Sequence, residues 1–96
     1  QYTSDKILIA VGGKAVKPEN IPGVEYASTT RELLNLEQQP EHLAIVGSNH
    51  IAVKLAGIMN GLISKVTLVV PNNQILPSCD RDLQTTIQEG MSQQGI

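Results

Sequence analysis

From Leu43 to Val70 the chain reads LAIVGSNHIAVKLAGIMNGLISKVTLVV, and a change of hydrophobic pattern divides this stretch into three parts. Its two ends, Leu43–Val46 and Val66–Val70, are short and continuously apolar, which is typical of strands buried on both faces of a sheet. The middle part has apolar residues at helical spacing on one face. These residues are Ile51, Leu55, Ile58, Met59 and Leu62. The stretch therefore predicts two parallel strands joined by a right-handed helical crossover.

The residues after Val70 extend this pattern by a turn and a second helix. Pro71-Asn72-Asn73 halts the second strand, because these residue types favour turns. Asp80 can cap a helix that ends near Gly95. The apolar face of that helix carries Leu83, Ile87 and Met91. Residues 42–96 thus predict β-α-β-α order, so the fold class is α/β: a Rossmann-like parallel sheet with helical crossovers, present as an incomplete unit.

The residues before this unit predict a strand, a connection and a short helix. Lys6–Val11 contains a continuously apolar run that Gly12-Gly13 stops, which favours a strand buried on both faces. Residues 14–27 contain two prolines and are expected to form a connecting loop. Thr29 and Glu32 have the spacing of a capping box, and the leucines that follow predict a helix of about two turns.

Composition limits the classes of protein that this chain can represent. Its 96 residues provide for one small domain, 41% of them are apolar, and the formal net charge is −2. Seven basic residues against nine acidic ones argue against nucleic acid as a partner. The single cysteine excludes an internal disulfide, and no cluster predicts a metal site. Apolar runs are too short to span a membrane and no signal-peptide pattern is present, so we expect a cytoplasmic protein. The first residue, Gln1, favours a fragment of a longer protein.

The turn between the first strand and the helix holds the candidate cofactor-binding residues Gly47, Ser48, Asn49, His50, Ile51 and Ala52. A dinucleotide fold places Gly-x-Gly-x-x-Gly/Ala here, so that the chain turns tightly, the pyrophosphate approaches the backbone, and helix and strand pack closely. The helix N-terminus offers free N–H groups and partial positive charge to the phosphates. Gly47 and Ala52 fit this pattern, whereas Asn49 puts a side chain where the phosphate approaches. Because Asn tolerates left-handed backbone angles, the turn itself is expected to persist, and Ser48 can supply an N-cap hydroxyl.

The end of the second strand carries no residue that selects a cofactor. An Asp or Glu there favours NAD, and a nearby Arg favours NADP. Val70 and Pro71 occupy this place, so the sequence specifies neither cofactor. Asn72 or Asn73 can hydrogen-bond a ribose, although turn residues after a strand are the simpler interpretation.

A set of strings spans nearly the whole chain: IAVGG, STTRELLNLEQQPEHLAIVG, IAVKLAGIMNGL, SKVTLV and ILPSCDRDLQTTIQEGMSQQGI. Together they resemble the flavoprotein pyridine-nucleotide disulfide oxidoreductases, and most of all the glutathione reductase branch of that family. The resemblance implies that residues 1–41 hold the end of an FAD-domain strand and a connecting segment, with Gly12 near the flavin nucleotide. It implies that residues 42–96 are a partial NAD(P)-binding βαβα unit.

The chain departs from the pattern of that family at several positions. The family usually has Gly at Asn49, Tyr at His50 and Glu at Lys54; the Tyr covers the nicotinamide pocket, and the Glu pairs with a lysine near the flavin. Further departures are Ile63 for Gly, Cys79 for Phe, and the missing 2′-phosphate arginines around Pro71 and Pro77. From the residues alone, His50 can stack on a nicotinamide, Lys54 can attract a phosphate and Cys79 can be a reactive thiol near a helix N-terminus. The residue types favour simpler interpretations: a partly exposed first-turn histidine, a solvated lysine and a half-buried inert thiol.

The resemblance implies the nucleotide-binding portion of an FAD-dependent NAD(P)H:disulfide oxidoreductase, in which hydride passes from NAD(P)H to the flavin and then to a disulfide. The implied partners are a dinucleotide and the remainder of the flavoprotein. The redox-active cysteine pair of the family is outside this stretch, so the chain alone is expected to be inactive. A nucleotide-incompetent structural module, which keeps the fold but not the site, stays open as the alternative. So does a homo-oligomer, because an incomplete sheet exposes an edge that pairs with other chains.

Overall fold

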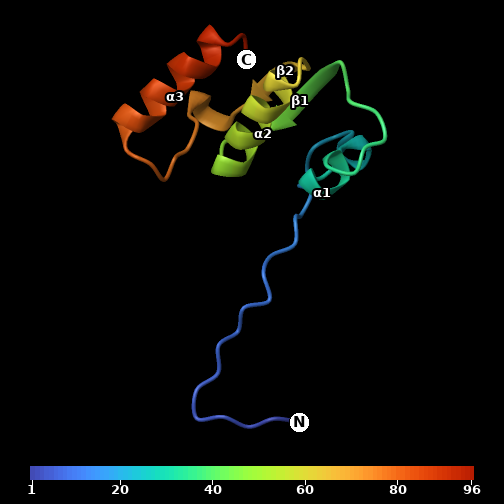
Figure 1. Ribbon diagram of the computed structural model, residues 1–96, viewed down its shortest axis with the longest axis vertical. Helices are drawn as coiled ribbons and strands as arrows, with labels where there is room; N and C mark the ends of the chain where they lie inside the picture. The colour runs from blue at the N-terminus through green and yellow to red at the C-terminus, as the bar shows by residue number, and fades with distance from the viewer. The chain divides into compact units, whose positions relative to one another are not determined.

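The computed structural model describes all of residues 1–96, which form two compact units, Gln1–Glu37 and Gln38–Ile96. Both strands and the two longer helices belong to the second unit (Figure 1). None of the helices combines the length and the apolar character that crossing a membrane requires.

The Gln38–Ile96 unit alternates strands and helices in the predicted order. Strand β1 (His42–Val46) is followed by helix α2 (His50–Gly61) and strand β2 (Lys65–Val69), and a single 3-10 turn, η2 (Pro71–Asn73), precedes helix α3 (Arg81–Gln93). The order confirms the α/β class, and the parallel two-stranded sheet with its helices matches an incomplete Rossmann-like unit.

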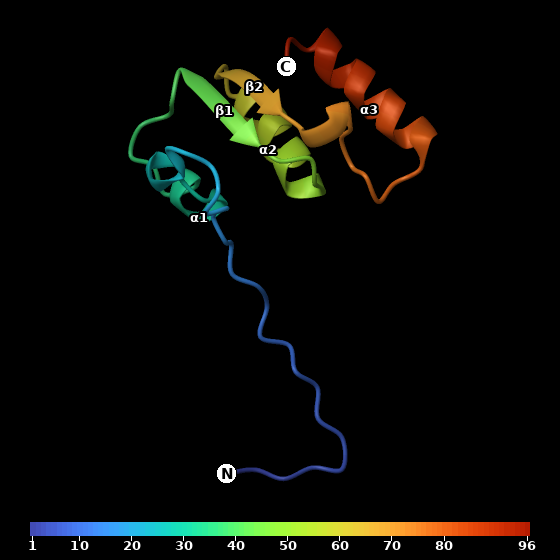
Figure 2. The same cartoon turned by 180° about the vertical axis from the view of Figure 1, so that it is seen from behind.

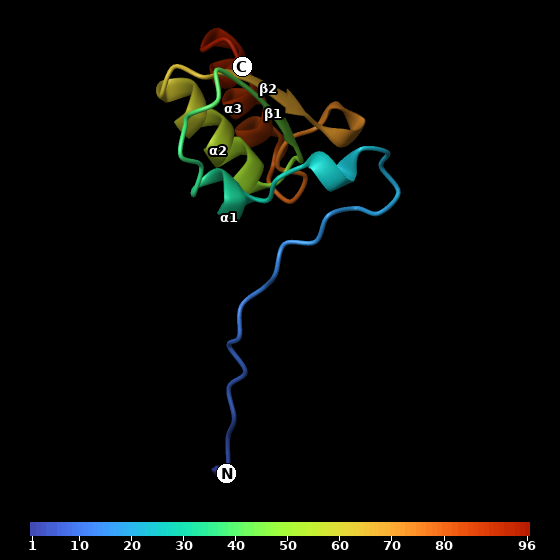
Figure 3. The same cartoon turned by 90° about the vertical axis from the view of Figure 1, so that its right-hand side faces the viewer.

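The sheet of this unit is a parallel pair. Its register sets His42 opposite Lys65 and Val46 opposite Val69. The Gly47 N–H continues the pairing beyond β1 by donating to the Val69 carbonyl oxygen at 3.0 Å. Figure 2 and Figure 3 show the two strands side by side with α2 packed along them. The carboxyl ends of both strands therefore meet at the turn that precedes α2.

A buried serine fastens the opposite, amino-terminal ends of the two strands. Ser64, which precedes β2, donates from Oγ to the Pro40 carbonyl oxygen at 2.6 Å and accepts from Gln39 Nε2 at 3.0 Å. Next to it, the Lys65 N–H donates to the Glu41 carbonyl oxygen at 2.7 Å. These bonds satisfy the Ser64 hydroxyl, as a buried polar group requires.

The face that α2 buries is narrower than the sequence predicts. Its buried residues are Ala52, Leu55, Ala56 and Met59, which lie against both strands. Leu55 and Met59 confirm the prediction, but Ile51, Ile58 and Leu62 are exposed, so that part of it is wrong. Helical spacing marks one broad apolar stripe, whereas a sheet of two strands contacts only a strip of it, where the two alanines let the helix approach closely.

The sheet is covered on one face only, which corrects the prediction of strands buried on both faces. Burial alternates along β1 and β2, as it does when one face is packed and the other is bare. The bare face carries Ala44, Val46, Thr67 and Val69. No helix or strand of the Gln38–Ile96 unit lies over it, so the apolar character of these strands has no packing partner there.

The ends of α3 follow the predicted signals. Asp80 caps the helix, because its Oδ1 accepts from the Leu83 N–H at 2.9 Å. Gly95 follows the helix with φ +85°, a left-handed angle that glycine adopts without steric cost. The predicted apolar face is only partly packed, because Leu83 is exposed while Ile87 and Met91 are half-buried. The buried residue of α3 is instead the polar Gln84.

The Gln1–Glu37 unit holds little regular structure: a 3-10 turn, η1 (Val24–Tyr26), and a single helical turn, α1 (Thr30–Leu33). The predicted strand over Lys6–Val11 is wrong, because this segment has no secondary structure and is exposed. A strand exists only when its backbone pairs with a neighbour, and no other segment of the chain pairs with this one. The helix that the sequence predicts at two turns is a single turn in the structure, because nucleating an isolated helix costs free energy.

The capping box of α1 is present as predicted. The Thr29 N–H donates to Glu32 Oε2 at 2.5 Å, and this hydrogen bond is the main cause that holds the pKa of Glu32 below its ordinary value. Because the pKa of Glu32 is depressed in the folded turn, the cap stabilises the turn fully at pH values above the ordinary Glu pKa. This stabilisation is lost as the pH falls through the lowered pKa of Glu32.

We therefore expect the Thr29 amide signal to titrate together with the Glu32 carboxyl group in an acid NMR titration. The Glu32→Gln variant is the control, because its amide accepts the same bond but does not titrate. A Thr29 signal that stays constant down to pH 2 in the unaltered chain would contradict the capping role.

Candidate functional site

The turn from β1 into α2 carries the predicted cofactor-binding residues, and its first residue needs to be glycine. Gly47 has φ +149°, a backbone angle that other residues rarely adopt. A Cβ built on Gly47 would lie 3.4 Å from the Cβ of Ala52, which is ordinary contact. Gly47 and Ala52 thus meet across the turn, where the dinucleotide pattern has its small residues.

Asn49 is the N-cap of α2. Its Oδ1 accepts from the Ala52 N–H at 3.0 Å, and its backbone is extended, with φ −80°. Two expectations are therefore wrong: Ser48 does not cap the helix, and Asn49 does not use a left-handed angle. Asn immediately before the first helical residue is among the preferred caps, so its position in the sequence already carried this signal.

The cap leaves other N–H groups of the helix start available. The first turn of any α-helix has N–H groups without partners inside the helix. Here the Ala52 N–H is taken by Asn49, whereas the N–H groups of His50 and Ile51 have no protein acceptor. No acidic side chain lies in the first turn to offset the positive end of the helix dipole. The turn can thus receive an anion, with one donor fewer than an uncapped helix would offer.

The side chains around this turn face solvent. His50 and Ile51 are exposed, as is Lys54 one turn further along α2. The other predicted cofactor residue, Gly12, belongs to the Gln1–Glu37 unit and has φ +72° with open space around it. Cys79 is half-buried, in agreement with the prediction from the residues alone.

The loop after β2 approaches the same turn, which sequence reasoning missed. The Leu76 N–H donates to the Ser48 carbonyl oxygen at 2.6 Å. Within the loop, Asn72, Asn73 and Leu76 all have positive φ, between +49° and +56°. Asn often adopts such angles, but Leu rarely does, so the angle at Leu76 is a sign of local constraint that no sequence pattern announces. Val70 and the other residues at the end of β2 bring no charged side chain here.

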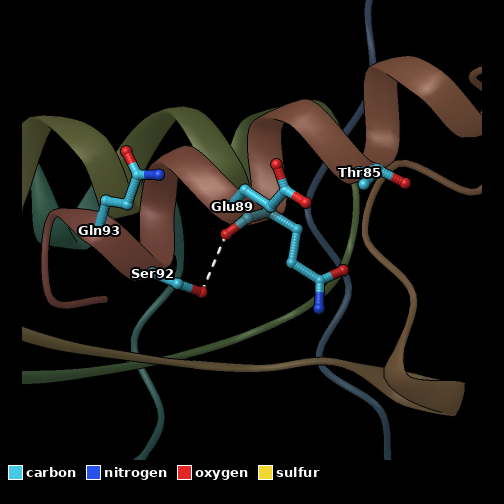
Figure 4. Close-up of a pocket in the computed structure, with 5 residues that line it drawn as sticks. Thr85, Glu89, Ser92 and Gln93 are labelled. Carbon is cyan, nitrogen blue, oxygen red and sulfur yellow. Dashed lines mark hydrogen bonds between the residues drawn. The ribbon is translucent and has the colours of Figure 1, made fainter.

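Two hollows of the surface are lined by residues outside this turn. Figure 4 shows one on α3 lined by Thr85, Gln88, Glu89, Ser92 and Gln93. All of its residues come from one helix, and the hydrogen bond drawn there joins Ser92 Oγ to the Gln88 carbonyl oxygen. A second hollow, between β2 and α3, is lined mainly by apolar side chains. The candidate site is therefore the open turn at Gly47–Ala52.

Comparison with known proteins gives matches over the whole chain. The pyridine nucleotide-disulphide oxidoreductase family matches residues 1–96. A glutathione reductase of Nostoc sp. is 51% identical over 96 residues, which is all of this chain and 21% of that protein. A glutathione reductase of Yarrowia lipolytica is 39% identical over 95 residues, covering 99% of this chain and 20% of that protein. The chain spans about a fifth of the length of these relatives.

Proposed function

The chain belongs to the pyridine nucleotide-disulphide oxidoreductase family, and from this premise we propose that residues 42–96 bind the diphosphate of NAD(P)H in a glutathione-reductase-like flavoprotein. Residues 1–41 would belong to the end of its FAD domain. In the intact flavoprotein the nicotinamide supplies hydride to the flavin, which passes the electrons to a disulfide. The part assigned to this chain is to bind and orient the nucleotide.

The single observation that carries this proposal is the geometry of the β1–α2 turn. Gly47 takes an angle suited to glycine, Ala52 packs against it, and the N–H groups of His50 and Ile51 are without protein acceptors. A diphosphate fits such a turn, because its oxygens accept from backbone N–H groups at the positive end of a helix. The fit extends to the diphosphate only, since Val70 and Pro71 offer neither the acid nor the arginine that selects a ribose.

A second candidate function, a structural module without nucleotide, is favoured by the Asn49 cap. The side-chain oxygen of Asn49 already occupies the Ala52 N–H, so the protein supplies its own acceptor at a place where a phosphate oxygen would bind. The bare sheet face with Val46 and Val69 favours an associated state of such a module. Removal of the Asn49 side chain separates these candidates.

We expect Asn49→Gly to raise the affinity for NADPH by about tenfold, because a freed N–H that bonds a charged phosphate is worth about 1.5 kcal/mol or more. The cost to α2 should be small, since replacing an N-cap by Gly loses only about a few tenths of a kcal/mol. The measurement is an NMR titration of the chain with NADPH and, separately, with NADH, following the signals of Gly47–Ala52.

Thr29→Gly is the matched control, because it removes the side chain of the α1 N-cap, which belongs to the Gln1–Glu37 unit, and changes no residue of the Gly47–Ala52 turn or of the β2–α3 loop. Its NADPH affinity should equal that of the unaltered chain. If neither the unaltered chain nor Asn49→Gly shows saturable shifts at millimolar nucleotide, the binding proposal fails and the structural module is favoured.

A further inference from the structure

Gln84 is a buried polar side chain whose hydrogen bonds all reach the loop between β2 and α3. It is 8% exposed. Its Nε2 donates to the carbonyl oxygens of Leu76, at 3.0 Å, and Cys79, at 2.8 Å. Its Oε1 accepts from Gln74 Nε2 at 2.9 Å. One amide on α3 therefore binds three positions of this loop. These bonds explain why α3 buries a glutamine while its apolar residues stay exposed or half-buried.

Leu76 is the residue on which these contacts converge. It is 6% exposed and has φ +49°, an angle that costs a non-glycine residue free energy and persists only when its surroundings hold it. Its carbonyl oxygen accepts from both Gln84 Nε2 and the Cys79 N–H, the latter at 2.9 Å. Its N–H donates to the Ser48 carbonyl oxygen at 2.6 Å. The constraint on Leu76 thus continues to the residue directly before the Asn49 cap.

The bond to Ser48 fixes the orientation of one peptide group in the candidate site. A trans peptide is planar, and its C=O and N–H point in opposite directions. With the Ser48 carbonyl held toward Leu76, the N–H of Asn49 has to point away from the β2–α3 loop. This N–H, together with those of His50 and Ile51, belongs to the first N–H groups of α2, which have no partner inside the helix and are available to an anion.

We propose that Gln84 is a positioning residue of the nucleotide turn: through Leu76 it holds the Ser48–Asn49 peptide in the orientation that presents the Asn49 N–H to the diphosphate. This role rests on the function proposed above. Gln84 does not contact the nucleotide, and its effect passes through Leu76 to Ser48. A loop without the Gln84 amide would leave the Cys79 carbonyl oxygen without this donor and the Leu76 carbonyl oxygen with the Cys79 N–H alone, so Leu76 would hold the Ser48–Asn49 peptide less firmly.

The test compares Gln84→Met with Gln88→Met in the full chain. Met keeps the length of the side chain but has no amide, and Gln88 lies one helical turn further along α3, exposed and without a side-chain hydrogen bond. Gln74→Met is the milder second variant, because it removes a single bond to Gln84 from an exposed residue. Two readouts are taken by NMR: amide exchange at Leu76 with the shift of the Asn49 amide, without nucleotide, and the Kd for NADPH.

For Gln84→Met we expect faster exchange at Leu76, a displaced Asn49 signal and a Kd raised about 2- to 30-fold. Gln74→Met should change the same signals less, and Gln88→Met should change none. Leu76 and Asn49 signals equal to those of Gln88→Met would overturn the positioning role, and so would an unchanged Kd in a chain that binds NADPH. If neither the unaltered chain nor Asn49→Gly binds NADPH, displaced signals in Gln84→Met would still support the coupling from Gln84 to Ser48, while the proposed function would be refuted.

Discussion

Replacing Leu55 by Ala should lower the free energy of unfolding by about 2–5 kcal/mol, the range for a buried leucine whose removal leaves a cavity. Leu55 is 8% exposed and lies in the middle of the α2 face that packs on both strands. A unit of this size has a total stability of only a few kcal/mol, so the loss would unfold a large share of the molecules. Urea denaturation followed by circular dichroism measures it.

Ile58→Ala on the same helix is the matched control. Ile58 is 46% exposed, so its truncation removes little buried surface, and both variants gain the favourable helix propensity of alanine, Ile58→Ala slightly more because isoleucine is the poorer helix former. Its cost should stay below about 1 kcal/mol. Equal losses for the two variants would show that the packed face of α2 is the broad stripe of the sequence pattern rather than the narrow face of the structure.

Gly47→Ala should cost about 1–3 kcal/mol, the range for a residue held at a sparsely populated backbone angle. The reason is φ +149° rather than crowding, because the added Cβ would lie at ordinary contact distance, 3.4 Å, from Ala52. The strain falls on the turn whose geometry carries the proposed function, so nucleotide affinity should fall together with the thermal midpoint.

Gly57→Ala makes the same chemical change with the opposite expected sign. Gly57 lies inside α2, with nothing within 4 Å of an added Cβ, so alanine should stabilise the chain by about 0.5–1 kcal/mol. Thermal unfolding of both variants decides the matter. A Gly47→Ala chain as stable as Gly57→Ala would mean that the turn relaxes to another angle at no cost, and that glycine is not required there.

The elements of this fold could be predicted because their signals are local. The cap at Asp80, the left-handed Gly95 and the box of Thr29 with Glu32 each depend on residues within one turn of one another. Asn49 carries an equally local cap signal, but the dinucleotide motif assigns its position to the approach of a phosphate, and the motif therefore favours Ser48 as the cap.

What could not be predicted depends on residues far apart in the chain. The burial of Gln84 and the bond from Leu76 to Ser48 arise only once the loop folds back on the turn. The apolar run at Lys6–Val11 has the composition of a strand, but composition supplies no partner for its backbone. Composition likewise cannot tell whether a second layer packs on a sheet, so the apolar residues of β1 and β2 predict burial on both faces although one face is bare.

The register of the sheet has a kinetic consequence. Each residue of β1 pairs with a residue of the very next strand, and only a turn and α2 lie between them. Helix formation takes on the order of a microsecond, and the entropy of closing so short a loop grows only slowly with its length. The strand pairing from His42 to Val69 involves no residue that follows Val69, so a chain emerging from the ribosome can form the β1–α2–β2 nucleus before α3 has emerged. The β1–α2 turn would then form early, and the loop held by Gln84 would pack onto it last.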